Sequence, residues 1–328
     1  MLVVVIPCFK ASRHVLDVIS AIDEKVDNIL LVDDACPEGS GKLVEQQCQD
    51  PRVEVLYHSE NKGVGAAVKT GYSRAWELGA DIVVKIDADG QMDPSLIPLF
   101  VAPLEAGEAD YTKGNRFFEA AVFHTMPRTR LWGNLGLSFL TKLSSGYWSN
   151  FDPTNGYTAL SAKLIPLLPL DKIADRYFFE SDMMFRLNTI RAVVMDIPMD
   201  AVYGEEESNL SPGRSVMPFF WQNCANFGKR IAYNYFGRDF NYASIELVLG
   251  VLLSGFGVIF GSYKWISNVI NGTTASAGTV MLSGLTVIIG IQMLLGFLQY
   301  DMSSVPRTPL QGRLYRHYKK ALNTQSER

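Results

Sequence analysis

The stretch IVVKIDADGQMDP, residues 82–94, decides the fold of this 328-residue chain. Its apolar run at residues 82–86 ends in Asp87-Ala88-Asp89, which is typical of a buried strand in a parallel sheet. Because strand side chains alternate, Asp87 and Asp89 are expected to point to one side, at the carboxyl end where such sheets bind ligands. Two carboxylates and the amide of Gln91 supply the hard oxygen atoms that Mg²⁺ or Mn²⁺ prefers, and a diphosphate can share that ion. The stretch therefore predicts a metal-assisted phosphate site.

Short apolar runs alternate with helical patterns ahead of this strand. The runs lie at residues 2–6, 28–32 and 53–57, and the helical patterns at residues 13–23, 41–48 and 65–78. This alternation predicts an α/β domain with a Rossmann-like, mostly parallel sheet that helices cover on both faces. Pro7 follows the first run, and Asp33 with Asp34 follows the second. We therefore expect these three residues on the same sheet edge as Asp87 and Asp89.

The segment NKGVGAAVKTGY, residues 61–72, is expected to open a helix after the third strand. It contains neither G-x-G-x-x-G nor G-x-x-x-x-G-K-[ST], which argues against a dinucleotide-binding fold and an ATPase. Lys62 lies where the N-terminus of a helix can meet a phosphate. The alternative is that the glycines only allow the helix to pack closely on the sheet.

Composition narrows the class of protein. The chain is 48% hydrophobic and 20% charged with a net charge of −4, which predicts a folded core and not a disordered chain. Residues 301–328 carry six Lys or Arg against two Asp or Glu, so one end is basic and the body acidic. That distribution argues against a nucleic-acid partner. The four cysteines form no C-x-x-C pair, so neither a disulfide framework nor a zinc site is expected.

Two stretches near the C-terminus have the length and composition of membrane-spanning helices. Residues 243–262 contain one charged residue and residues 278–300 contain none, and about 20 apolar residues are needed to cross a bilayer. Small residues in both stretches suit close helix packing in lipid: Gly250, Ser254, Gly257, Gly284 and Gly290. The alternative is a pair of buried core helices.

Lysines and arginines flank this pair of stretches on both outer sides, and only Lys264 lies between them. The positive-inside rule then predicts a transmembrane hairpin at residues 243–300, with the N-terminal domain and both termini in the cytoplasm. Residues 213–242 mix aromatic and basic side chains and are expected to form an amphipathic juxtamembrane segment or a solvent-covered connector. The predicted order is an α/β domain at residues 1–212, this segment, the hairpin, and a basic cytoplasmic tail at residues 301–328.

Seven segments, in order, carry a resemblance to a known family. They are IPCFKA (6–11), LVDDACPEGSG (31–41), NKGVGAAVKTGY (61–72), DADGQMDP (87–94), KGNRF (113–117), FDPTNGYTALS (151–161) and YFFESDMMFRL (177–187). Together they resemble the family 2 glycosyltransferases of the GT-A fold, and more narrowly the polyprenyl-phosphate glycosyltransferases of the dolichol-phosphate mannose synthase and bacterial undecaprenyl-phosphate glucosyltransferase type. The resemblance covers about residues 1–210. It implies an inverting enzyme that uses Mg²⁺ or Mn²⁺ to move a sugar from a UDP- or GDP-sugar to a polyprenyl phosphate at the cytoplasmic membrane face.

The resemblance implies a role for each matching residue. The residues implied to bind the nucleotide-sugar are Pro7, Phe9, Asp33, Asp34, Lys62, Asp87, Ala88 and Asp89. Those implied to bind the metal are Asp89 and Gln91, and those implied to bind the acceptor phosphate are Arg116, Arg128 and Arg130. The implied catalytic residues are Asp89, Arg116, Glu180 and Asp182. The chain departs from the family at Lys10 and Ala11, where a Glu is usual, and at residues 201–214, which lack the usual basic pair; Arg214 is then the candidate that holds the donor diphosphate.

The acceptor decides what Asp182 does. A lipid phosphate is already anionic near neutral pH and needs positioning, so Asp182 would orient a substrate. A diacylglycerol or glycan hydroxyl would instead need Asp182 as its general base. A rival of another class is a catalytically silent membrane scaffold, against which the intact Asp87, Asp89 and Gln91 argue. The sequence leaves the sugar, the nucleotide and the oligomeric state open, a homo-oligomer included.

Overall fold

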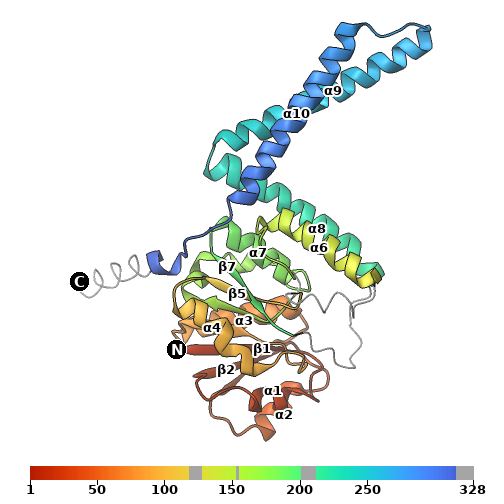
Figure 1. Cartoon of the computed structure of the whole chain (residues 1–328). Helices are drawn as coiled ribbons and strands as arrows, with labels where there is room; N and C mark the ends of the chain where they lie inside the picture. Colours follow the sequence, from red (N-terminus) through yellow and green to blue (C-terminus); the bar gives the residue numbers. More distant parts are fainter. Residues whose placement is uncertain (118–127, 153–154, 201–211, 315–328) are drawn as a thin grey trace. The chain divides into compact units, whose positions relative to one another are not determined.

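The computed structural model describes residues 1–117, 128–152, 155–200 and 212–314, without the side chains of residues 128–132, 134 and 212–216. The chain forms two compact units (Figure 1). Met1–Phe227 and Pro306–Arg328 form the first, here named the sheet unit, and Gly228–Val305 form the second, the hairpin unit.

The sheet unit is built on one sheet. Within the described residues it has seven strands in the order β3-β2-β1-β4-β6-β5-β7. They are β1 (Leu2–Cys8), β2 (Asn28–Asp33), β3 (Val53–Tyr57), β4 (Ile82–Lys85), β5 (Tyr111–Asn115), β6 (Thr158–Ser161) and β7 (Val194–Pro198). Strand β6 runs antiparallel to its neighbours β4 and β5, whereas the other pairs are parallel. The predicted mostly parallel α/β sheet is confirmed, and its first four strands lie close to their predicted ranges.

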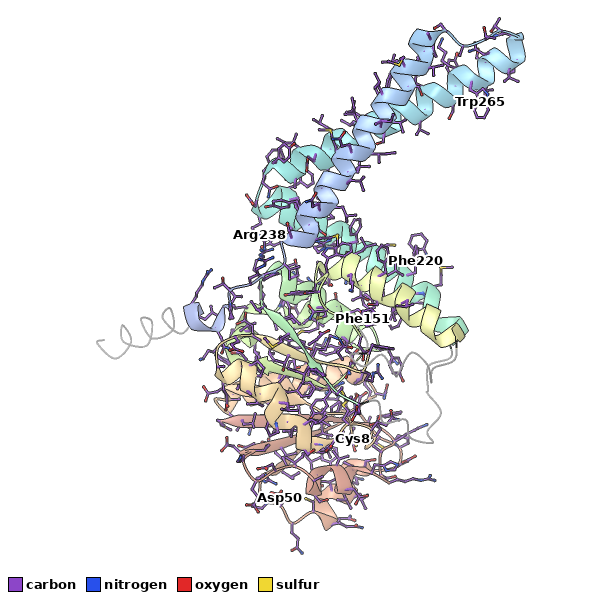
Figure 2. All side chains as sticks on the ribbon, viewed as in Figure 1. Cys8, Asp50, Phe151, Phe220, Arg238 and Trp265 are labelled. Atoms are coloured by element: carbon purple, nitrogen blue, oxygen red, sulfur yellow. The ribbon has the colours of Figure 1, made fainter. Side chains whose placement is uncertain are left out.

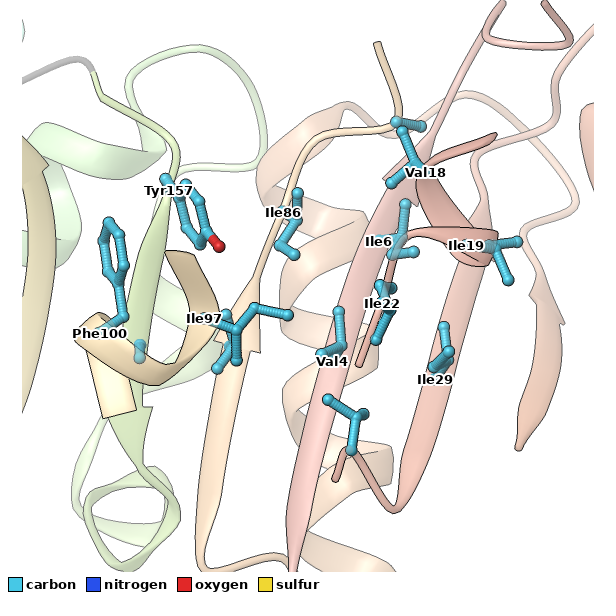
Figure 3. Packing of buried hydrophobic residues seen from close by; sticks show 14 of the residues in the cluster. Val4, Ile6, Val18, Ile19, Ile22, Ile29, Ile86, Ile97, Phe100 and Tyr157 are labelled. Carbon is cyan, nitrogen blue, oxygen red and sulfur yellow. The ribbon is translucent and has the colours of Figure 1, made fainter. Parts of the chain in front are cut away.

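Helices cover both faces of the sheet. One face packs against α1 (Val15–Ser20), α2 (Ser40–Gln47) and α4 (Ile97–Glu105), and the other against α3 (Val64–Glu77) and α7 (Phe179–Thr189). Val4 and Ile6 of β1 point into the first layer, where they meet Val18 of α1 and Ile97 of α4 (Figure 3). Because strand side chains alternate, the neighbouring positions of each strand face α3 and α7.

Within the described residues, the sheet unit also contains short helical turns and two long helices. They are η1 (Pro94–Leu96), η2 (Ala162–Leu167), η3 (Leu170–Lys172), α6 (Arg128–Ser145) and α8 (Pro212–Ala232), whose last residues belong to the hairpin unit.

The chain returns to the sheet unit after the hairpin unit. Asp110 is fully buried and accepts hydrogen bonds from the backbone N–H groups of Leu310 and Gln311, each at 2.8 Å. The side-chain amide of Gln311 donates to the carbonyl oxygens of Leu104 and Ala109, each at 2.7 Å. We name residues 306–314 the return segment. Buried polar groups of this kind are stable only when paired, so the return segment is an integral part of the sheet unit.

The observed units therefore divide the chain differently from the predicted domains. The sheet unit extends to Phe227, beyond the predicted end at residue 212, because α8 continues to pack on it. Part of the predicted cytoplasmic tail also belongs to the sheet unit through the contacts of Gln311.

The hairpin unit contains two long helices, α9 (Tyr242–Asn271) and α10 (Ala277–Ser303), after a π-helical turn at Tyr233–Arg238. Both are long and apolar enough to cross a membrane, and they include the predicted spans. Within their most apolar windows only 22% and 11% of the residues are buried. Such exposure does not fit the alternative of buried core helices. Arg238 and Trp265 lie toward opposite ends of this hairpin (Figure 2).

Small residues allow α9 and α10 to approach closely. A Cβ atom on Gly257 would lie 2.6 Å from Val287 Cγ2, and Ser283 Oγ donates a hydrogen bond to the Gly257 carbonyl at 2.9 Å. Gly250 and Gly290 are similarly enclosed, as predicted for a lipid-type helix contact. Gly284 departs from that prediction, since nothing lies within 4 Å of the position of its Cβ.

A buried ion pair joins the two ends of the hairpin unit. Arg230 donates to both carboxylate oxygens of Asp301, at 2.6 and 2.9 Å, and the Tyr235 hydroxyl donates to the same carboxylate at 2.6 Å. Arg230 is 1% and Asp301 2% exposed. Loss of either partner would leave a buried charge uncompensated, which typically costs about 3–5 kcal/mol.

Candidate active site

The carboxyl ends of β1, β2, β4 and β5 meet at one edge of the sheet, because these strands run in the same direction. The predicted edge is therefore confirmed. Pro7 is buried near the end of β1, and Phe9, which follows it, is 44% exposed. Ala88 is buried directly after β4. Ligand contacts of these three residues stay predictions.

Asp33 and Asp34 use their carboxylates to hold the loops of this edge. Asp33 accepts from the backbone N–H of Gly41 at 2.7 Å. Asp34 accepts from the N–H groups of Lys62 and Gly63, at 2.9 and 2.7 Å. Both aspartates are nearly fully buried. Their hydrogen bonds bring the start of α3, with Lys62, to the ends of β1 and β2.

The residues after β4 form a tight turn, residues 87–91, which we name the acidic turn. Asp89 Oδ1 accepts from the N–H of Gln91 at 3.0 Å, and the φ of +74° at Gly90 lets the chain reverse there. Asp87, Asp89 and Gln91 are all partly exposed.

The acidic turn fits a hard divalent cation that also takes ligands from a diphosphate. Asp89 and Gln91 offer carboxylate and amide oxygen atoms, the ligand type that Mg²⁺ and Mn²⁺ prefer. Among the described residues no group of three or more His, Cys, Asp or Glu side chains could hold a metal ion.

A buried lysine lies beneath the acidic turn. Lys85, the last residue of β4, is 1% exposed and faces the same side of the sheet as Asp87. Its Nζ lies 2.7 Å from Asp87 Oδ1 and 3.5 Å from Glu180 Oε1 of α7. Burial lowers the pKa of Lys85, but the two carboxylates outweigh burial and the pKa lies above its ordinary value. Burial also raises the pKa of Glu180, which Lys85 opposes.

This ion cluster depends on a glycine. A Cβ atom on Gly156, two residues before β6, would lie 2.6 Å from Asp87 Oδ2 and closer still to Lys85 Nζ. No larger residue fits there unless Lys85 or Asp87 moves. The cluster thus connects the acidic turn, α7 and the segment before β6.

Arg116, directly after β5, is held by a buried carboxylate. Its Nε donates to Asp152 Oδ2 at 2.7 Å and its Nη2 to Asp152 Oδ1 at 2.8 Å, which is the bidentate geometry of a strong charge-assisted pair. Asp152 is 1% exposed, whereas the Arg116 side chain is 29% exposed. The segments KGNRF and FDPTNGY are thus joined, and Arg116 reaches the same sheet edge as the acidic turn.

Comparisons with known proteins show which family the chain belongs to. The model of the glycosyl transferase family 2 matches residues 3–166. The chain belongs to glycosyl transferase family 2. It is 30% identical over 231 residues to the UDP-N-acetylglucosamine–dolichyl-phosphate N-acetylglucosaminyltransferase of Methanococcus voltae, a match that covers 66% of this chain and 91% of the relative. It is also 30% identical over 189 residues to the undecaprenyl-phosphate mannosyltransferase of Micrococcus luteus, covering 57% of this chain and 76% of the relative.

Solved structures support the fold assignment. Glucosyl-3-phosphoglycerate synthase from Mycobacterium tuberculosis, in complex with Mn²⁺, uridine diphosphate and phosphoglyceric acid, aligns with a TM-score of 0.52 at 19% identity. The alignment covers 70% of this chain and 78% of that structure. The sheet unit therefore has the GT-A fold of family 2.

Two acidic residues predicted for family 2 catalysis occupy different environments on α7. Glu180 belongs to the Lys85 cluster and is only partly buried. Asp182 is 5% exposed, and its two oxygen atoms accept from Ala174 N and Asn226 Nδ2, each at 2.9 Å. Asp182 thus fastens α7 to its neighbours, while Glu180 lies beside the acidic turn.

Three predicted arginines lie where the structure describes no side chains. Arg128 and Arg130 open α6, and Arg214 lies in the first turn of α8. Their side chains are outside the described residues, so their phosphate contacts stay predictions.

The sequence motifs did not single out Lys85 and Asp152, although Lys85 pairs with Asp87 and Asp152 pairs with Arg116. A signal for Lys85 was available: a single charge inside the apolar run IVVKI, two residues before Asp87, is expected on the same face. Asp152 carries a φ of +51°, a conformation that L-residues rarely adopt. The sequence does not reveal this backbone conformation.

Proposed function

We propose that this family 2 glycosyltransferase moves a sugar from a nucleoside diphosphate to a polyprenyl phosphate at the cytoplasmic face of a membrane. One observation carries the proposal. The acidic turn and Arg116 stand at the same edge, after β4 and β5, which are separated only by β6. Two strand spacings amount to about 10 Å. That separation suits a donor diphosphate at one side, an acceptor phosphate at the other and one sugar between them.

The donor end is the acidic turn. Mg²⁺ or Mn²⁺ held by Asp89 and Gln91 would neutralise charge on the leaving diphosphate. Asp87, fixed by Lys85 at 2.7 Å, would face the ribose or the sugar. Arg214 is the candidate for a further diphosphate contact. Among the solved structures of the fold are complexes with uridine diphosphate and Mn²⁺ or Mg²⁺, which supports this end of the proposal.

The acceptor end is Arg116, with Arg128 and Arg130 as further candidates. Two anions must approach each other, so guanidinium groups that bind phosphate bidentately are required. An acceptor phosphate oxygen then bonds to the anomeric carbon from the side opposite the leaving group. The bond from that carbon to the diphosphate oxygen breaks, and its electron pair leaves with the nucleoside diphosphate. No proton transfer is needed, and the anomeric configuration inverts.

The environment of Asp182 favours a phosphate acceptor over a hydroxyl acceptor. A general base needs an oxygen atom within hydrogen-bond reach of the nucleophile. Asp182 is only 5% exposed, and each of its oxygen atoms accepts a hydrogen bond inside the fold, which makes it poorly accessible to a substrate hydroxyl. The names of the two relatives, which act on dolichyl phosphate and undecaprenyl phosphate, point the same way.

Membrane attachment at the cytoplasmic face is supported by chain connectivity. The chain leaves the sheet unit at Phe227 and re-enters it at Pro306. A folded unit stays on one side of a bilayer, so both outer ends of the α9–α10 hairpin would lie on that side. The basic residues outside the hairpin favour the cytoplasm.

The test is a lipid-extraction assay. Detergent-purified protein, Mg²⁺ or Mn²⁺, a panel of labelled UDP- and GDP-sugars and a polyprenyl phosphate are incubated, and label in the organic phase is counted. We expect transfer by the wild type, a loss of about 100-fold or more for Asp89→Ala, and wild-type activity for Asp171→Ala, which changes an exposed residue of η3.

Two other outcomes would favour the rivals. Donor binding in calorimetry without transfer to the lipid phosphate, together with transfer to a diacylglycerol or glycan that Asp182→Asn abolishes, would support a hydroxyl acceptor. Absence of any donor or metal binding would support a silent scaffold.

A further inference from the structure

We propose that Asp152 is a positioning residue that fixes the plane of the Arg116 guanidinium for the acceptor phosphate. The inference rests on the proposed function, which assigns Arg116 to that phosphate. Asp152 itself is too deeply buried, at 1% exposure, to be a ready substrate contact. Its whole carboxylate is directed at Arg116 and its neighbours.

Asp152 holds Arg116 through several hydrogen bonds to its carboxylate. The two side-chain bonds from Arg116, at 2.7 and 2.8 Å, are joined by a third from the Arg116 backbone N–H at 3.1 Å. Asn155 Nδ2 donates to the same carboxylate at 3.2 Å. Fixing an arginine side chain in this way costs conformational entropy. The cost falls on folding and not on substrate binding, because the side chain is already ordered when the substrate arrives. The guanidinium edge that Asp152 does not use keeps a set direction.

A buried lysine also holds the backbone of Asp152 in place. Lys113 of β5 is 1% exposed, and its Nζ donates to the carbonyl oxygen of Asp152 at 2.6 Å and to that of Phe151. The carboxylate of Asp196 lies 3.8 Å from Lys113 Nζ and accepts from the Phe151 N–H at 2.8 Å. Burial lowers the pKa of Lys113, against the opposing charges of Asp196 and Asp152.

The backbone of Asp152 has an uncommon conformation. Its φ of +51° lies in the left-handed region, which few non-glycine residues occupy, although aspartate does so more often than most. A glycine would adopt this conformation readily but would lack the carboxylate that holds Arg116.

The test is a double-mutant cycle with Arg116→Ala, Asp152→Asn and the combined variant. The measured quantities are KM for a short-chain polyprenyl phosphate, KM for the nucleotide-sugar, kcat, and calorimetric binding of the lipid phosphate. We expect Arg116→Ala to raise the acceptor KM about 100-fold and Asp152→Asn about 10-fold, as for the loss of charge-assisted hydrogen bonds. The donor KM should stay within about twofold. In the Arg116→Ala background, Asp152→Asn should have no further effect on the acceptor KM.

Arg116→Lys keeps the charge but not the bidentate geometry, and it avoids any folding defect of a substitution at the buried Asp152. We expect it to raise the acceptor KM about 10-fold as well. Thermal unfolding of each variant separates a loss of fold from a loss of positioning.

Several results would overturn the inference. If Arg116→Ala raises the acceptor KM but Asp152→Asn or Arg116→Lys leaves the acceptor KM at the wild-type value, this inference is overturned and the proposed function still stands. Multiplicative effects of the two substitutions, or equal rises in donor and acceptor KM, would assign Asp152 a merely structural role. An unchanged acceptor KM in Arg116→Ala would overturn the assignment of Arg116 in the proposed function as well.

Discussion

Gly156→Ala should damage the donor site while leaving the fold nearly intact. The added methyl group would overlap Asp87 Oδ2 and Lys85 Nζ, because the position of its Cβ lies 2.6 Å from the first and closer to the second. These atoms belong to the ion cluster beneath the acidic turn. The substitution therefore acts on the side chains of the site and not on the apolar core.

The magnitude follows from the ion pair. To regain ordinary contact distance the lysine nitrogen must retreat by about 1 Å, which lengthens its 2.7 Å separation from Asp87 Oδ1 to about 3.7 Å. At an effective dielectric constant of about 20 the Coulomb attraction then weakens by about 1.7 kcal/mol. If nucleotide binding requires Asp87 to return to its original position beside Lys85, the variant must spend about 2 kcal/mol on that movement. The nucleotide would then bind about 30-fold more weakly.

The assay is calorimetric titration of UDP and GDP with Mn²⁺, beside thermal unfolding. Gly136→Ala is the matched control, since it adds the same methyl group in α6 where nothing lies within 4 Å. The control should bind the nucleotide as the wild type does and gain about 0.5–1 kcal/mol of stability. Wild-type nucleotide affinity in a folded Gly156→Ala protein would refute the reasoning, because the cluster would then have no part in donor binding.

Three further predictions concern other parts of the molecule. Gln311→Ala should lower the free energy of unfolding by about 1–3 kcal/mol in a denaturant titration, because it removes two buried hydrogen bonds; the Leu104 carbonyl keeps the Gly107 N–H as a donor, whereas the Ala109 carbonyl loses its side-chain partner. A change below roughly 0.5 kcal/mol would contradict an integral return segment. At pH 8 iodoacetamide should modify Cys36 faster than Cys8, in mass-spectrometric time courses, because burial raises the pKa of Cys8 to about 12 while hydrogen bonds that outweigh its burial lower the pKa of Cys36; equal rates would contradict this. In detergent, Gly257→Leu should lower the melting temperature of the hairpin and Gly255→Leu should not, since only the first glycine touches α10; equal changes would mean that the helices do not pack at Gly257.

The part of the fold that could be predicted is the part with strong local periodicity. The strands at residues 2–8, 28–33 and 82–85 consist mainly of buried apolar residues, and their sequence alone marks them as core strands. The edge strand at residues 53–57 is at most partly buried, but its Val and Leu residues are still typical of a strand. Strand β5 reads YTKGN, which is polar, and it is a strand because β6 and β7 pair with it. That stabilisation comes from distant residues and leaves no local pattern.

The candidate site likewise contains residues that could be placed from the sequence and residues that could not. Asp87 and Asp89 could be placed at the sheet edge from the strand that precedes them. The partners of Arg116 and Asp110 could not, because Asp152 and Gln311 are 36 and 201 residues away along the chain. Buried polar pairs are chosen by the fold as a whole, so a single sequence does not display them.

The return segment has a consequence for the order in which the protein is made. The carboxylate of Asp110 cannot form its hydrogen bonds with Leu310 and Gln311 until those residues have been synthesised. They are added about 80 residues after Phe227, at a translation rate of about 5–20 residues per second. Both hairpin helices are synthesised during that interval. The last contacts of the sheet unit therefore form only after both hairpin helices have been translated, so the domain that performs the chemistry is completed after the hairpin is made.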